Sequence, residues 1–162
     1  MADKTMLLVL DEVRGKTLRL LHDVSEEQAR WAPPGLSNSI LWHAGHAHCL
    51  MEHLVLETLG RPPEMPEGWF DMFSWSSKPA TVPAERWPKL AEVTAQLQSQ
   101  HRRARAALEA ATAEQLVGAF PNPQSHWHGR PLSFVVFHGL HDEAMHGGEV
   151  HLLRKLQGIS TK

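Results

Sequence analysis

Apolar residues recur at the three- and four-residue spacing of an amphipathic helix in four long segments of the chain. No segment shows the sustained alternation of apolar and polar residues that is typical of a strand. We therefore expect an all-α protein, a four-helix bundle of one domain over residues 1–162, with long connections between helices. The helices are predicted at about residues 3–22, 37–60, 83–111 and 131–157.

Two short capping patterns and two irregular stretches connect these helices. Ser25 to Gln28 and Thr112 to Gln115 each match the capping box that opens a short helical turn. Residues 61–83 and 118–130 form long irregular connections, and their large aromatic side chains argue against disorder. We expect aromatic side chains from these connections to wall a substrate pocket at one end of the bundle: Trp69, Phe73, Trp75 and Trp127.

The fourth predicted helix carries polar residues in the middle of its only mostly apolar face. A carboxylate in a core costs roughly several kcal/mol unless it is paired, protonated or bound to a metal. Asp142 and His146 are four residues apart, a spacing that lets two side chains bind one ion. At about 100° per residue, Asp142 is the centre of an arc that also holds Val135, His138, Met145, His146, Glu149, Leu153 and Leu156.

This face predicts a buried metal site. His138 and Glu149 share the arc, so they are either further ligands or partners that orient the ligands, one of them acting as a base. For His146 alone, the alternative is a core histidine that is only hydrogen-bonded.

We expect the second predicted helix to supply a third ligand, because it contains four histidines. His43, His46 and His53 form a row beside its apolar stripe, and His48 lies on the other flank. Position on the helical wheel favours His43, which is nearest to the centre of the stripe. Cys49 is predicted to point away from the core, so we do not expect a thiolate ligand.

Composition narrows the function classes. Sixteen basic and eighteen acidic residues give a net charge of −2, which offers no electrostatic case for nucleic-acid binding. The chain has one cysteine and a short N-terminal apolar run, so we expect a cytoplasmic protein with no disulfide and no membrane partner. Serine-hydrolase, P-loop, dinucleotide and H-E-x-x-H motifs are all absent from the sequence.

Two motifs together resemble the DinB-like (DinB/YfiT) superfamily: S-I-L-W-H-A-G-H at residues 39–46 and H-D-E-A-M-H-G-G-E at residues 141–149. The resemblance in helix order, loop length and motif placement extends over essentially the whole chain. It implies a four-helix bundle in which three side chains, typically histidines, hold one divalent metal near the end of the bundle. It places the second-helix ligand at His46, in preference to His43, which the helical wheel favours and which stays the alternative. It places the fourth-helix ligands at Asp142 and His146.

Asp142 departs from the family pattern, which has histidine at that position. Two histidines and one carboxylate resemble the facial triad of non-haem Fe(II) enzymes, and Zn or Ni also fits. Proteins that this chain resembles include bacillithiol- or mycothiol-dependent transferases, a maleylpyruvate isomerase, hydrolases and the metal-binding domain of sulfoxide synthases.

The resemblance thus implies a metal that activates a thiol or water towards a small-molecule substrate, with a low-molecular-weight thiol as a second cofactor. We also expect a homodimer. The competing prediction is a non-catalytic bundle that binds metal or a small ligand or serves as a dimerising scaffold, because this fold hosts both kinds of protein.

Overall fold

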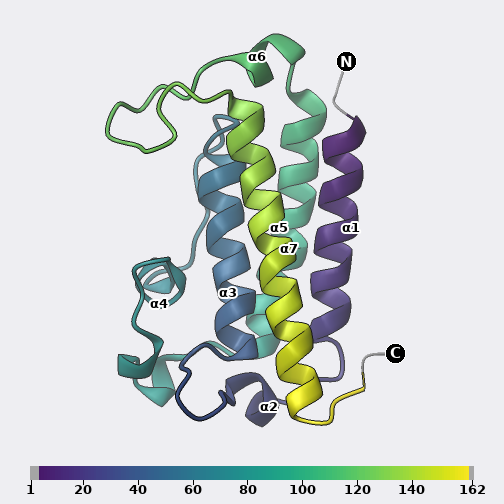
Figure 1. The fold of residues 1–162 in the computed structure, drawn as a ribbon, viewed down its shortest axis with the longest axis vertical. Coiled ribbons are helices and arrows are strands. Elements are labelled where there is room, and N and C mark those ends of the chain that lie inside the picture. Colours follow the sequence, from purple (N-terminus) through teal and green to yellow (C-terminus); the bar gives the residue numbers. More distant parts are fainter. Residues whose placement is uncertain (1–3, 161–162) are drawn as a thin grey trace.

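The structure, a computed structural model, describes residues 4–160. Four long helices run side by side along the long axis of the molecule (Figure 1), and the all-α prediction is confirmed. The one strand-like pairing within the described residues is an isolated bridge between Ala119 and Pro131. The long helices are α1 (Lys4–Leu21), α3 (Ile40–Leu50), continued by the π-helix η1 (Met51–Leu56), α5 (Leu90–Ala110) and α7 (Leu132–Leu156).

Short helices and turns occupy the ends of this bundle and one of its sides (Figure 1). The connection between η1 and α5 was predicted to be irregular. That prediction was wrong in part, because the connection contains one α-helix and two 3-10 turns. The short elements are α2 (Glu26–Arg30), α4 (Trp69–Phe73), η2 (Pro79–Thr81), η3 (Ala84–Arg86) and α6 (Ala113–Val117).

Local sequence signals begin and end most of these helices. The Ser25 hydroxyl accepts a hydrogen bond from the backbone N–H of Gln28, and the Gln28 side chain accepts one from the backbone of Ser25, so this capping box is complete. Thr112 caps α6 through the backbone N–H of Gln115. Ser39 caps α3 in the same way, which sets the start of the helix that carries the histidines.

The third long helix begins later than the sequence predicted. It starts at Leu90 and not near Pro83, because Trp87 precedes Pro88 and holds an extended backbone with ψ of 131°. A residue before proline is sterically pushed out of the α conformation. The segment before α5 is therefore free to cover the side of the bundle.

The buried face of α7 is rotated from the predicted one. Glu143 is fully buried and Asp142 is half-buried, so the centre of the buried face lies nearer to Glu143. Met145 and Leu156, predicted to face inward, are 59% and 57% exposed, and Glu149 is exposed as well. The prediction failed because buried polar residues such as Glu143, which the core pairs with partners, cannot be recognised from apolarity alone.

Helix α3 is buried on every face, from Ile40 to Leu50. It packs against α7, α5, α2 and α4, which leaves none of its sides to solvent. Cys49 is therefore fully buried, and the prediction that it points away from the core was wrong. Burial and the neighbouring Glu52 raise the pKa of its thiol to about 12, so a thiolate is strongly disfavoured there.

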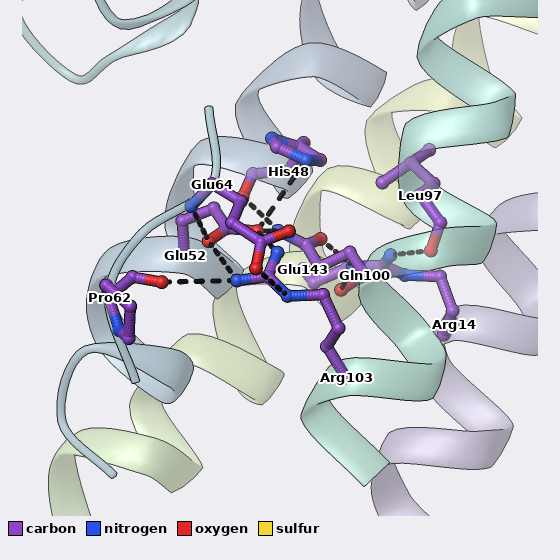
Figure 2. Close-up of polar contacts among 9 residues, drawn as sticks. All are labelled: Arg14, His48, Glu52, Pro62, Glu64, Leu97, Gln100, Arg103 and Glu143. Atoms are coloured by element: carbon purple, nitrogen blue, oxygen red, sulfur yellow. Dashed lines mark hydrogen bonds and ion pairs between the residues drawn. The ribbon is translucent and has the colours of Figure 1, made fainter. Parts of the chain in front are cut away.

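A buried polar network joins the long helices (Figure 2). The Arg14 guanidinium donates to both carboxylate oxygens of Glu143, at 2.7 and 2.9 Å, and to the side-chain oxygen of Gln100 at 3.0 Å. Gln100 in turn donates to Glu52 at 2.7 Å, and Arg103 donates to the same carboxylate at 2.9 Å. Residues of α1, η1, α5 and α7 are thus held in one arrangement by charge-assisted hydrogen bonds.

Within residues 4–160, the helices all fall short of the length and apolarity needed to cross a lipid bilayer.

Candidate metal and ligand site

Three histidine rings meet where α3 faces α7. The His46 and His146 rings lie edge to face with centroids 4.5 Å apart, and the centroids of His43 and His146 are 5.2 Å apart. The Trp42 ring stacks on His46 at 4.6 Å. The structure therefore brings together the predicted ligands His46 and His146, and it also places the alternative ligand His43 beside them.

The hydrogen bond of His46 determines which ring nitrogen carries its proton. Its Nδ1 contacts the backbone carbonyl of Phe73, which can only accept a hydrogen bond, so Nδ1 carries the hydrogen. Burial lowers the pKa of His46, against the opposing effects of the Phe73 carbonyl and the charge of Asp142. The neutral ring then has a lone pair at Nε2, the state that a metal ligand requires.

His43 and His146 share a hydrogen bond, with their Nδ1 atoms 2.9 Å apart. Burial is the main cause that lowers the pKa of His43 to about 3, and the charges of His146 and His46 add to it. Burial and His46 lower the pKa of His146 to about 4, although Asp142 and Glu143 oppose this. All three rings are therefore neutral near pH 7.

Asp142 lies at the edge of this cluster and is oriented by its neighbour one turn away. Its Oδ2 is 3.1 Å from Nε2 of His138, and its Oδ1 is 3.7 Å from Nδ1 of His141. His138 thus occupies the position expected of a partner that orients Asp142. Glu149, the other predicted partner, is exposed and is not among the residues lining the adjoining cavity.

The chemistry of the donors fits a divalent metal, although the side chains do not form a finished ligand set. Neutral imidazole and carboxylate are the donors that Zn, Ni and Fe accept. Among residues 4–160, no three His, Cys, Asp or Glu side chains are arranged as a metal-binding group. The hydrogen bond to His43 occupies Nδ1 of His146, which leaves Nε2 as its free ligand atom.

A cavity of about 890 Å³ adjoins the cluster. His46 and Asp142 line it, together with residues of η1, α6 and the loop before α7. Two predicted pocket residues, Trp75 and Trp127, also line it. The other two predictions were wrong: Trp69 and Phe73 are buried in the core, where Phe73 packs on Gly45 and Trp69 on His48, so neither reaches the cavity.

A second polar group in the wall of this cavity was not predicted from the sequence. His53, Glu57 and Thr58 line it, and Nδ1 of His53 is 2.9 Å from Oε2 of Glu57. The sequence pattern pointed to this group only in part, because His53 falls in the same helical row as His43 and His46. This pattern gave no reason to prefer His53 over the other histidines, because its four-residue spacing to Glu57 is an ordinary helical spacing and does not reveal the cavity beside it.

Comparison with solved structures finds a conserved protein from Enterococcus faecalis with a TM-score of 0.76. The two share 16% sequence identity, and the match covers 96% of this chain and 97% of that chain, which supports the fold and nothing beyond it. No curated protein matches the sequence. The family model of the DinB superfamily matches residues 9–150, most of the chain. This protein therefore belongs to the DinB superfamily.

Proposed function

We propose that this protein binds one divalent metal ion through His46, Asp142 and His146 and that it is a metal-dependent enzyme of thiol S-transferase or hydrolase type. The observation that carries the proposal is the His46–His146 cluster of neutral, mostly buried imidazoles, with Asp142 beside it, at the wall of a cavity of about 890 Å³. Three protein ligands leave coordination positions for substrate or water, as in catalytic ions and unlike closed structural ones.

The protein's own groups have distinct roles in this proposal. Hydrogen bonding to the Phe73 carbonyl orients His46, and His138 orients Asp142. Trp75 and Trp127 bind the apolar part of the substrate. A bound Zn, Ni or Fe ion would supply Lewis acidity, which lowers the pKa of a thiol or water and creates a nucleophile near neutral pH. A low-molecular-weight thiol is the proposed second substrate.

Metal analysis of untagged protein tests the proposal, because a nickel affinity column would load a protein with twelve histidines artificially. We expect the parent protein to hold one ion per chain, and His46→Ala and His146→Ala to lose most of it. His22→Ala, which changes an exposed histidine, should keep the metal. Chelation should lower the melting temperature of the parent by mass action. Full metal retention in both cluster variants would sink the proposed site.

The second candidate is a bundle that binds a small ligand without catalysis. It is favoured by one observation, the 2.9 Å hydrogen bond between His43 and His146, which satisfies the fourth-helix imidazole without a metal. Cobalt substitution separates the two candidates. If added thiols perturb the cobalt absorption spectrum, the ion has open positions and the enzyme is favoured, whereas an unresponsive spectrum or a failure to bind cobalt favours the second candidate.

A further inference from the structure

One wall of the cavity is formed by η1 and the residues after it. This wall contains polar groups that the proposed metal site does not use. This wall, which we call the η1 wall, comprises His53, Glu57 and Thr58. Glu57 closes the π-helical turn by donating its backbone N–H to the Glu52 carbonyl five residues earlier, at 2.9 Å. Single π-turns inside helices are frequent at functional sites. His53 lies within this turn, and Glu57 and Thr58 follow it directly.

His53 and Glu57 form a histidine–carboxylate pair. Nδ1 of His53 lies 2.9 Å from Oε2 of Glu57. A carboxylate can only accept, so Nδ1 carries the hydrogen, and in the neutral form of the ring Nε2 has the lone pair. Nε2 is buried and has no hydrogen-bond partner among residues 4–160. Leaving a buried acceptor unpaired costs about 1–3 kcal/mol, so a partner from outside the protein would be favoured.

Thr58 supplies a second, independent polar atom on the same wall. Its side chain is 8% exposed, and its Oγ1 is buried without a hydrogen-bond partner in the described part of the chain. Threonine can donate one hydrogen bond and accept others. Two unpaired polar atoms on one wall of a cavity indicate a ligand that both donates and accepts hydrogen bonds.

Aromatic rings surround the polar groups. Phe70 and Trp75 lie edge-on to the His53 ring, with centroids 5.2 and 5.9 Å away. Trp75 is 63% exposed, so its side chain is free to change rotamer when a ligand approaches the His53 ring. Trp127 lines the cavity as well. An apolar or aromatic ligand body matches these surfaces.

The charges of the lining restrict the ligand further. No lysine or arginine of residues 4–160 lines this cavity, whereas Glu57 and Asp142 do. An anionic ligand would meet carboxylates and no guanidinium or ammonium partner, which disfavours it. A neutral ligand with a weakly acidic hydroxyl or thiol avoids this repulsion when it enters, and after proton transfer the His53 imidazolium is the cation beside its anion.

We propose that the η1 wall is a binding and proton-accepting subsite for a neutral aromatic or apolar compound that carries a hydroxyl or thiol. The O–H or S–H bond breaks, its electron pair stays on the oxygen or sulfur, and the proton forms a new bond to Nε2 of His53. Glu57 is a positioning residue that holds the ring and stabilises the imidazolium, and Thr58 hydrogen bonds to the ligand. The inference rests on the proposed function only in assigning the reaction to this cavity.

The test uses 4-nitrophenol, a neutral aromatic hydroxyl compound whose ionised form absorbs at longer wavelength. The full-length protein is treated with a chelator, so that no metal ionises the probe, and titrated at a pH where the free probe is mostly protonated. We expect binding and a shift of the bound probe towards the ionised spectrum. Thr58→Val should weaken binding about fivefold. His53→Leu should abolish the spectral shift, and Glu57→Gln should reduce it while binding persists.

Matched controls and circular dichroism separate these effects from loss of fold. Thr94→Val and His22→Leu, which lie outside the cavity lining, should behave as the parent does. If His53→Leu fails to fold, Glu57→Gln and Thr58→Val decide. Equal affinity and equal spectra in all variants would overturn the subsite, and absence of binding to the parent would overturn its ligand class. Because the chelator removes metal beforehand, this test does not depend on whether the proposed metal site exists. The metal analysis likewise does not depend on whether the η1 wall binds the probe.

Discussion

At the residue scale, Asp142 carries the departure from the three-histidine pattern that the family resemblance implies. Its carboxylate is oriented by His138 at 3.1 Å and lies close enough to His46 and His146 to raise the pKa of both against the effect of burial. A ligand and a group that merely orients ligands can both occupy such a position. Two substitutions of this residue distinguish them.

We predict that Asp142→His retains metal, because it restores a three-histidine donor set, with an altered preference among Zn, Ni and Fe. Asp142→Asn should weaken metal binding markedly, since a neutral amide is a poor ligand for these ions. Titration of both variants against a competing chelator gives their order of affinity. The reverse order, with Asn above His, would mean that Asp142 only orients other groups.

At the scale of elements, α4 packs so closely on α3 that only a glycine fits at position 45. A Cβ at Gly45 would lie 2.3 Å from the Phe73 ring, which is fully buried. We predict that Gly45→Ala lowers the free energy of unfolding by about 1–3 kcal/mol, as overpacking does in other cores. Because the Phe73 carbonyl holds His46, metal affinity should fall too.

Gly148→Ala is the matched control for this change. Gly148 lies within α7, is exposed, and would place its new Cβ in open space. Alanine should stabilise the helix by about 0.5–1 kcal/mol through its higher helix propensity. Denaturant unfolding of both variants measures the difference, and equal effects at the two positions would contradict the packing argument.

The pair of Arg14 and Glu143 links α1 to α7 with both side chains fully buried. We predict that Glu143→Leu alone lowers the free energy of unfolding by about 3–5 kcal/mol, because it leaves the Arg14 charge without its partner. The double variant with Arg14→Met should regain much of this loss, since no buried charge remains. Chemical denaturation measures all three proteins.

The exposed pair of Arg19 and Glu12, 4.0 Å apart, serves as the comparison. Glu12→Leu should change stability by at most about 1 kcal/mol, because water screens exposed charges. If Glu143→Leu proved as mild as Glu12→Leu, the guanidinium of Arg14 would have to reach solvent once its partner is removed.

At the scale of the whole molecule, the buried neutral histidines make stability depend on pH. The pKa of His43 falls to about 3, and the pKa values of His48 and His146 fall to about 4, from 6.5, with burial as the main cause at each. Below pH 6.5 the unfolded chain binds protons at these positions and the folded protein does not. Stability is therefore highest above pH 6.5 and is lost as the pH falls towards 4.

We predict a fall in the free energy of unfolding of up to about 1.4 kcal/mol per pH unit for each such histidine, between pH 6.5 and pH 4. Denaturant titrations of chelator-treated protein at several pH values measure it. His146→Gln should reduce the slope, because one titrating ring is gone. A flat profile over this interval would show that these rings take up protons in the folded state.

The expected homodimer stays a prediction that sedimentation can test.

Much of the architecture follows from local sequence. The four long helices, the caps at Ser25, Ser39 and Thr112, and the glycine with a φ of +69° that ends α7 at Gly158 all depend on residues within a few positions of one another. Short-range steric and hydrogen-bonding preferences act in any context, so periodicity and capping residues suffice to predict them. The two histidine motifs likewise identified the pair of helices that meet at the site.

Tertiary structure alone decided which side chains face one another. Glu143 is buried because Arg14, 129 positions away in the chain, comes to neutralise it, and this turned the inward face of α7 away from the predicted one. His53 lies in the cavity wall because residues of α6 and of the loop before α7 enclose the space beside it, whereas Trp69 and Phe73 are buried in the core. Desolvation and long-range pairing set these outcomes, and neither is encoded in the spacing of residues along a single helix.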